Sequence, residues 1–530
     1  MSKKKNQLVF FAIVLFSVAV LIPSKSTIAQ TTYSQSSGTT TLTGQTFTSS
    51  TNDLSAVKVT GGTLNLSSST ISSSGNTSST DNSSFYGLNA VILAYTSSGT
   101  AIINSSGNTI TSTGTGANGI FAYGTASATT ENDKFIHTGE GGHAIMCSGG
   151  GTITVVNDSA VTSGSSSSTI ATDRGSGTIT VTGGYYAAKG NRSAAVYSTG
   201  VITCTDATLV AEGAEALVIE GSNSIILNDC TTKCTYNKWG ALLYQSMSGD
   251  ADGVDGYLYL NGGTFTYTGT QGGMFYNTNS TAHIYLNGVT LENSCDTLIR
   301  CIKGSWGGSS ASSGGITRLY CDGQTLSGLI HVDANSTLYD TLCNSSNFTG
   351  AINNSNTAKL VSLVMDASST WTLTKDSHLT IIVNSAGISG TTVTNITGNG
   401  FNVYYNSSNS ANSYLGGGTY SLSGGGYLLP EGTTDVENET SLPTDWSLSQ
   451  NYPNPFNPST TINFQVPVSG QVTLQVFDVL GREVETLVNG VKQVGSYSIT
   501  FNAQDLPSGV YVYRIRGNNF IQSKKMLLIK

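Results

Sequence analysis

The central part of the sequence repeats itself about every 25 residues, and this period constrains the fold more than any other feature. Five consecutive repeats, spaced 26, 26, 26 and 23 residues apart, open at Gly99, Thr125, Gly151, Gly177 and Gly200. The pattern returns at Gly256 and Ala282, where GYLYLNGGTFTYTG is followed by AHIYLNGVTLENS. Each repeat holds short runs of alternating polar and apolar residues separated by Gly, Asn, Asp or Ser. Such runs predict strands with one buried face.

A period near 25 residues is that of one coil of a three-sided parallel β-helix. The alternative, a β-propeller, needs about 40–50 residues per blade. Proline placement favours the β-helix, because none of the eight prolines lies between residues 24 and 429 and proline is excluded from central strands. We therefore expect an all-β chain in which residues 30–430 form a right-handed parallel β-helix of roughly 14 coils.

The alternation also predicts which side chains face the interior. In the first strand of each coil, the pairs that should point inward and stack from coil to coil include Ile153 with Val155, Ile179 with Val181, and Leu258 with Leu260. The outward positions of that strand form a column that runs Thr154, Thr180, Thr203, Ile226, Tyr259, Tyr285 and Tyr320.

The outward column becomes aromatic in its second half. Tyr259, Tyr285 and Tyr320 follow one another, and Tyr257 with His283 forms a neighbouring column. Sugar rings stack on exposed aromatic faces, so these residues are a candidate platform for an extended glycan. The alternative is that the aromatic pairs only stabilise the sheet.

An acidic loop is the candidate metal site. The segment GDADGVDG (249–256) places Asp250, Asp252 and Asp255 within six residues. Calcium binds carboxylate and carbonyl oxygens from flexible loops, so calcium is the candidate cofactor. The spacing is not that of an EF-hand, and a solvated corner turn is the alternative. This loop belongs to one of two insertions, around 72–86 and 246–255, that lengthen their repeats, and insertions of this kind collect binding features.

No catalytic constellation is evident. The five histidines show neither HxH nor HExxH spacing, and there is no nucleophile elbow. Glu212, Glu215 and Glu220 lie near one another, but scattered acids at coil corners need no catalytic role. We expect a protein that is not an enzyme. A polysaccharide lyase or glycoside hydrolase of the β-helix type is the alternative, and it would bring acids and a Lys or Arg together on one groove.

All eight cysteines lie within the repeats. Cys204 and Cys321 fall in the inward column of Val155 and Val181, where a thiol behaves as a small apolar side chain. Export would also permit disulfides, with Cys230–Cys234 or Cys295–Cys301 as the candidate pairs.

The N-terminus predicts export. Lys3, Lys4 and Lys5 precede an apolar run over 8–22, and small residues lead up to Ala29, so residues 1–29 are expected to be a cleaved signal peptide. An uncleaved membrane anchor is the alternative, but the run is short for a full span. No other segment is apolar enough to cross a membrane. Residues 31–430 hold 12 Lys and Arg against 22 Asp and Glu, which argues against a nucleic-acid partner.

The composition changes at Pro430. Residues 431–445 are acidic without a basic residue and predict a linker. Alternating runs then predict a small antiparallel sandwich over 446–530, with its strands at 471–478, 484–488, 496–502, 510–516 and 525–530.

Four motifs of this C-terminal segment carry a specific resemblance. NYPNPFNPST (451–460), VFDVLGREV (476–484), LPSGVYVYRI (506–515) and SKKMLLIK (523–530) resemble the C-terminal sorting domain of the type IX secretion system. The resemblance implies an Ig-like sandwich that directs its cargo through the type IX machinery, from the periplasm to the outer cell surface or the medium.

A second resemblance concerns the repeats. YQSMSGDADG (244–253), MFYNTN (274–279) and LNGVTL (286–291) resemble bacterial surface β-helix proteins of adhesin-like or carbohydrate-associated kind, over roughly 200–430. We expect a secreted or cell-surface protein, adhesin-like, with polysaccharide or cell-surface glycan as its partner. A structural surface-layer component is a further alternative.

Overall fold

The computed structural model describes residues 32–306, 314–431, 445–518 and 520–529. The predicted signal peptide and nearly all of the predicted linker lie outside these residues. The chain divides into two compact units, 1–431 and 432–530, which are described separately. No helix in the described ranges is long and apolar enough to cross a membrane.

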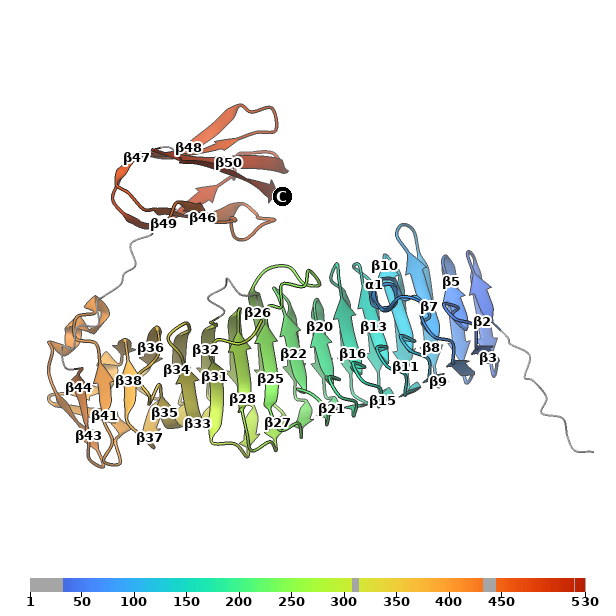
Figure 1. The fold of residues 1–530 in the computed structure, drawn as a ribbon, viewed down its shortest axis with the longest axis horizontal. Coiled ribbons are helices and arrows are strands. Elements are labelled where there is room, and N and C mark those ends of the chain that lie inside the picture. The colour runs from blue at the N-terminus through green and yellow to red at the C-terminus, as the bar shows by residue number, and fades with distance from the viewer. Residues whose placement is uncertain (1–31, 307–313, 432–444, 519, 530) are drawn as a thin grey trace, which may run out of the picture. The chain divides into compact units, whose positions relative to one another are not determined.

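The first unit is a parallel β-solenoid, as the repeat predicts (Figure 1). Over residues 33–293 the chain passes in turn through three sheets, named A, B and C, and each strand pairs in parallel with its equivalent in the next coil. Beyond these residues the described strands of this unit belong to sheets A and B alone, and two pairs within 388–430 are antiparallel. Sheet A has 20 strands, sheet B has 14 and sheet C has 10.

Sheet A contains β1 (Tyr33–Gln35), β4 (Val57–Val59), β7 (Ile92–Thr96), β10 (Ile120–Gly124), β13 (Ile145–Ser148), β16 (Ile170–Asp173), β19 (Val196–Ser198), β22 (Leu217–Glu220), β25 (Trp239–Tyr244), β28 (Gly273–Thr278), β31 (Thr297–Cys301), β33 (Thr325–Val332), β35 (Asn347–Ile352), β37 (Thr370–Leu373), β38 (Ser377–Leu379), β40 (Ile388–Ser389), β41 (Thr392–Thr397), β42 (Val403–Tyr405), β43 (Tyr420–Ser423) and β44 (Tyr427–Pro430).

Sheet B contains β2 (Thr39–Thr43), β5 (Gly62–Ser67), β8 (Ala101–Ser106), β11 (Ser127–Glu131), β14 (Thr152–Val156), β17 (Thr178–Thr182), β20 (Val201–Thr205), β23 (Ser224–Asn228), β26 (Asp255–Asn261), β29 (Thr281–Asn287), β32 (Ile316–Asp322), β34 (Thr337–Cys343), β36 (Leu360–Met365) and β39 (Ile381–Val383).

Sheet C contains β3 (Thr46–Ser49), β6 (Thr70–Ser73), β9 (Thr109–Ser112), β12 (Lys134–His137), β15 (Ser159–Thr162), β18 (Tyr185–Ala188), β21 (Thr208–Ala211), β24 (Thr231–Cys234), β27 (Thr264–Tyr267) and β30 (Thr290–Asn293). The described helices are α1 (Thr80–Tyr86), which lies in the first insertion, and the short 3-10 helices η1 (Ser385–Gly387) and η2 (Ser410–Leu415).

The predicted register of sheet B is confirmed. Val155, Val181 and Cys204 are Cα partners in successive coils and are fully buried, and the column continues to Cys321. Thr154 and Thr180 pair on the opposite, exposed face. The inward side chains of all three sheets form one continuous apolar core.

The cysteines are free thiols, and seven of the eight are buried. The two candidate disulfides do not form. Cys230 directly precedes β24 and Cys234 is its last residue; four residues of extended strand span about 13 Å, whereas a disulfide joins Cα atoms about 4.4–6.8 Å apart. Cys295 lies in the bend before β31 and Cys301 is the last residue of that strand, and both are free thiols.

One inward position of sheet B holds a carboxyl group. Asp340 lies between Leu319 and Leu363, is 1 % exposed, and neither carboxyl oxygen has a hydrogen-bond partner among the described residues. Burial raises the pKa of Asp340 to about 7. Burial likewise raises the pKa of Asp133 to about 6 and that of Asp158 to about 7.

These carboxyls predict a solenoid that is more stable at pH 5 than at pH 8. Because the pKa of each carboxyl is higher in the folded than in the unfolded protein, protonation stabilises the fold. This stabilisation is complete below about pH 4 and is lost as the pH rises through about 7. Asp340→Leu should raise the free energy of unfolding at pH 8 by up to about 4 kcal/mol, which corresponds to a pKa raised from 3.8 to about 7, and much less at pH 5. Asp340→Asn, which keeps a buried polar group, should flatten the pH dependence with less stabilisation. Urea unfolding at both pH values would show it, and an unchanged pH dependence in both variants would contradict the assignment.

The second unit is an antiparallel sandwich. One sheet contains β45 (Ser447–Leu448), β46 (Ser459–Val466) and β49 (Gly495–Asn502). The other contains β48 (Glu483–Lys492), β47 (Gly470–Phe477), β50 (Gly509–Gly517) and β51 (Phe520–Leu528). The two sheets enclose their own apolar core. The second and last of the predicted strands are longer than the sequence predicts, since β48 reaches Lys492 and β51 begins at Phe520.

Candidate functional site

The predicted aromatic column forms a continuous ladder on the outer face of sheet B. The rings of Tyr259 and Tyr285 stack with centroids 4.5 Å apart and planes 6° apart. Tyr285 and Tyr320 stack at 4.6 Å and 10°. Because coils are themselves about 4.8 Å apart, each ring stands across the sheet with its face against the next ring. The ladder therefore presents ring edges to solvent over most of its length, not the flat platform that the sequence suggests.

One ring face of the ladder is left open at its C-terminal end. Tyr320 pairs in register with Thr341 of the next coil, and a threonine is too small to cover a tyrosine ring. The change from Tyr320 to Thr341 therefore forms a step in the column. This step lines a groove of about 280 Å3, together with the next outward column, which contributes Asn261, Asn287 and Asp322. An aromatic face beside amide and carboxylate groups offers both an apolar surface and hydrogen-bonding partners to a ligand.

The neighbouring column is longer than the sequence analysis recognised. Tyr257 stacks on His283 at 4.5 Å, and the column continues in register through Arg318 to Tyr339. The guanidinium group of Arg318 lies 4.5 Å from the centre of the Tyr339 ring, a cation–π contact. The alternation that identified Tyr320 could have identified Arg318, two residues earlier on the same strand.

The three aspartates of the acidic loop point to separate partners. Asp250 Oδ1 lies 3.3 Å from Nη2 of Arg174, and Asp255 Oδ1 lies 3.5 Å from Nε2 of His283. The backbone carbonyl of Asp252 accepts a hydrogen bond from the Ser222 amide at 2.8 Å. Within the described ranges no three His, Cys, Asp or Glu side chains are grouped to hold a metal ion. Calcium at this loop stays a prediction, and binding would require the loop to rearrange.

One arginine connects the two insertions on the outer face of sheet A. The sequence analysis did not identify this connection. Arg174, in the turn after β16, places its guanidinium 4.1 Å from the ring centre of Phe85 in α1 and pairs with Asp250 of the second insertion. Phe85 and Asp250 are therefore brought together across several coils by one arginine.

A buried carboxylate lies on the same face. Glu220, one of the acids that the sequence shows near one another, is 2 % exposed. Its carboxylate accepts hydrogen bonds from the hydroxyls of Tyr197 at 2.5 Å and Tyr244 at 2.8 Å, and from Ser246 Oγ. These three hydroxyls hold the Glu220 carboxylate in place.

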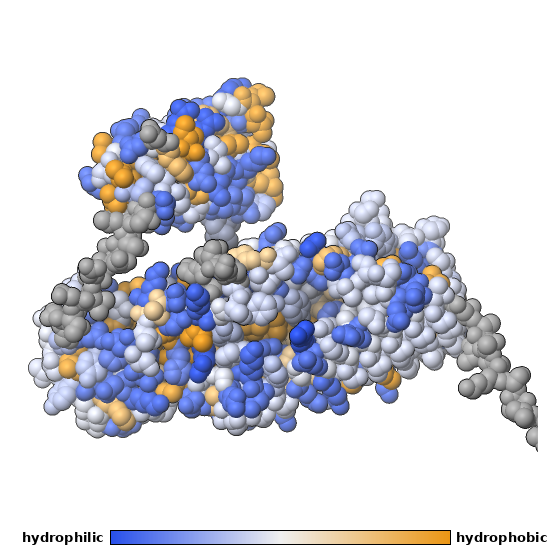
Figure 2. Space-filling model, viewed as in Figure 1, coloured by the Kyte–Doolittle hydropathy of each residue, from blue (hydrophilic) through white to orange (hydrophobic). Residues whose placement is uncertain are grey.

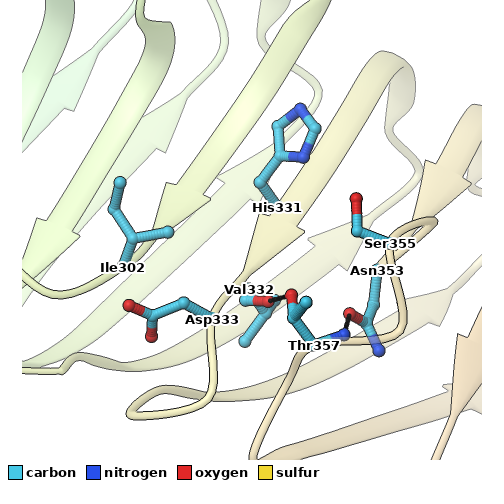
Figure 3. Close-up of a pocket in the computed structure, with 7 residues that line it drawn as sticks. All are labelled: Ile302, His331, Val332, Asp333, Asn353, Ser355 and Thr357. Carbon is cyan, nitrogen blue, oxygen red and sulfur yellow. Dashed lines mark hydrogen bonds between the residues drawn. The ribbon is translucent and has the colours of Figure 1, made fainter.

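A smaller cavity lies further along sheet A (Figure 3). It has a volume of about 90 Å3 and is lined by Ile302, His331, Val332, Asp333, Asn353, Ser355 and Thr357. The Asp333 carboxylate already accepts hydrogen bonds from the amides of Lys303 and Asn335 and from Ser336 Oγ. The cavity has room for a few water molecules, and these hydrogen bonds fix the Asp333 carboxylate on its wall.

The C-terminal unit carries the features that its motifs imply. In the NYPNPFNPST motif, Asn451 donates from its side chain to Thr460 Oγ1 at 3.0 Å and to the Pro453 carbonyl at 3.1 Å. The backbone amide of Asn451 donates a hydrogen bond to the Tyr513 hydroxyl at 2.8 Å. The motif is therefore tied to the core of the sandwich.

The surface of this unit is also rich in exposed apolar side chains. Among the described residues, the large apolar side chains more than 60 % exposed all lie in this unit, at Tyr452, Val479, Leu480, Val491 and Ile521. Apolar patches are visible on it in Figure 2.

The comparisons with known proteins identify this unit. Residues 450–530 match the family model of the secretion system C-terminal sorting domain. The chain is thus an exported protein, composed of a β-solenoid and a type IX sorting domain that directs it to the cell surface or the extracellular space. The match covers the C-terminal unit alone. The comparisons with curated proteins and with solved structures gave no match.

Proposed function

We propose that the solenoid is a non-enzymatic, adhesin-like module that binds an extended glycan along the outer face of sheet B. The observation that carries the proposal is the step at Tyr320, where an aromatic face opens into a groove lined by Asn261, Asn287 and Asp322. One sugar ring would stack on Tyr320, and its hydroxyls would bond to the amide and carboxylate groups. Neighbouring sugars would continue along the edges of the ladder, where tyrosine hydroxyls are presented.

Export supports the proposal, because a sorting domain brings the solenoid to the surface where glycans are met. The sparse charge of the solenoid also fits a neutral polysaccharide better than a strongly charged one. The ring stacking itself has a structural role, since it stabilises sheet B in the way that aromatic cross-strand pairs do. The two roles make different predictions for single residues of the ladder.

Tyr320→Ala should weaken glycan binding at least tenfold, about 1.4 kcal/mol, because it removes the open ring face. Tyr285→Ala should weaken binding less, because both faces of that ring are already covered, one by Tyr259 and the other by Tyr320. A glycan array would choose the polysaccharide, and titration of the secreted protein would measure affinity. Tyr185→Ala, at a 44 % exposed tyrosine on sheet C, is the matched control and should bind as the native protein does.

Melting curves separate binding from stability. Tyr320→Ala removes one stacking contact and should lower stability by only about 1 kcal/mol. Full binding by a well-folded Tyr320→Ala variant would show that the ladder only stabilises the sheet. Equal losses for Tyr320→Ala and Tyr185→Ala would place the glycan elsewhere.

A further inference from the structure

The outer face of sheet A carries a second apolar layer, which α1 covers. Leu93, Phe121, Met146 and Ala171 are buried together on this face, away from the solenoid interior. α1 is fixed there by Ser148 Oγ, which donates to the Phe85 carbonyl at 2.5 Å. The helix ends at Tyr86, and at the capping residue Gly87 an added Cβ would lie 2.6 Å from the Leu93 side chain and 2.7 Å from the Phe121 ring. The first insertion is therefore a packed part of the fold.

Beside α1 lies a cleft of about 410 Å3, the size of a small-molecule site. Strands β16 and β19 contribute Asp173 and Tyr197 to its lining. The turns that lead into sheet A contribute Glu140, His143 and Arg192. The helix contributes hydroxyl groups, among them that of Ser84.

The cleft holds more hydrogen-bonding groups than the fold uses. Nδ1 of His143 is buried and has no hydrogen-bond partner among the described residues. Burial lowers the pKa of His143 to about 4, so the ring is neutral at physiological pH. Burial, aided by the carboxylates of Asp250 and Glu220, raises the pKa of Asp173 to about 7, so this carboxyl can donate as well as accept near neutral pH.

These groups favour a neutral, polyhydroxylated ligand. Carboxylates accept paired hydrogen bonds from adjacent hydroxyls, Arg192 donates, and the Tyr197 ring supplies an apolar surface. A phosphate or carboxylate ligand would meet the carboxylates of Glu140 and of the neighbouring Glu220, which oppose an anion. The volume suits one or two sugar rings.

We propose that this cleft is a second binding site of the solenoid, specific for a neutral monosaccharide or disaccharide unit. It lies on sheet A, whereas the tyrosine ladder lies on sheet B, so it does not depend on the ladder. The two sites would let the protein hold a short glycan terminus on one face and an extended chain on another.

The test is titration of the secreted full-length protein with glucose, galactose, mannose, fucose, N-acetylglucosamine, maltose and cellobiose. At least one of these should bind the native protein. Glu140→Gln, which keeps shape and removes charge, should weaken that sugar at least tenfold. Arg192→Asn should do the same; asparagine is chosen because Arg192 has a φ of 56°, which asparagine tolerates.

Tyr320→Ala is the control for the other face, and it should leave binding of the small sugar unchanged. Glu140→Gln should conversely leave polysaccharide binding at the ladder unchanged, so the two proposals fail separately. The proposal is overturned if none of the seven sugars binds. It is equally overturned if both cleft variants, folded by their melting curves, bind the sugar as the native protein does.

Discussion

Val181→Asp should leave little folded solenoid at pH 8, whereas Thr180→Asp should leave the fold intact. Val181 is fully buried between Val155 and Cys204, while Thr180 points to solvent from the same strand. Losing a buried valine costs about 1.5–3 kcal/mol, and an unpaired buried carboxyl costs several kcal/mol more. This total is comparable to the whole stability of many domains.

Asp340 shows how the solenoid accommodates one such carboxyl and predicts a partial rescue of the variant. Because burial raises the pKa of Asp340 to about 7, we expect the introduced aspartate to be neutral when folded at low pH. Val181→Asp should therefore fold better at pH 5 than at pH 8. Val181→Thr is the milder control, since Thr130 already occupies the same inward column. Soluble yield and circular dichroism at both pH values would measure these effects. Equal tolerance of Asp at 180 and 181 would disprove the register.

The register of sheet B could be predicted because two periods coincide in the sequence. Alternation along each strand assigns Thr180 and Val181 to opposite faces, and the repeat of about 25 residues aligns them with Thr154 and Val155 one coil earlier. Both signals are local, so no knowledge of distant contacts is needed. The same reasoning placed Cys321 in the core and Tyr320 on the surface, as the structure has them.

The cleft on sheet A could not be predicted in this way. It depends on where α1 lies against sheet A, and the position of an insertion does not follow from a repeat. One signal was present: β10 (IFAYG) and β13 (IMCS) are continuous apolar runs, not alternating ones. Such runs are typical of strands buried on both faces, and they indicate that something covers the outside of sheet A.

The ring geometry of the ladder also lay beyond the sequence. The alternation and the repeat place Tyr259 and Tyr285 on adjacent coils, but the spacing of the coils determines that their ring faces cover one another.

The end of the solenoid differs by one residue from the sequence prediction. The acidic composition assigns residue 431 to the linker, whereas Glu431 belongs to the solenoid unit. Its carboxylate lies 2.7 Å from Nδ1 of His378.

Deleting residues 446–530 should stop secretion almost completely while leaving the solenoid folded. The solenoid core is formed by residues up to Leu428, and the sorting domain has a separate core that begins at Leu448. Neither core loses a residue when the other is removed. Since the sorting domain directs export, the truncated chain should accumulate in the periplasm. Cell fractionation and protease treatment of whole cells would locate it, and melting of the purified chain would show an unchanged solenoid transition.

A point variant distinguishes recognition of the folded sorting domain from recognition of its sequence alone. Tyr513 is fully buried, accepts a hydrogen bond from the Asn451 amide and donates to the Ser449 carbonyl, both at 2.8 Å. Tyr513→Ala removes a core aromatic, at about 3–5 kcal/mol, and detaches the NYPNPFNPST motif. If the machinery reads the folded sandwich, this variant should be retained like the deletion, while Thr180→Asp, with an intact sorting domain, is secreted. Normal surface display of the truncated chain would contradict the role of the sorting domain. Secretion of Tyr513→Ala alone would show that an unfolded sorting sequence is sufficient.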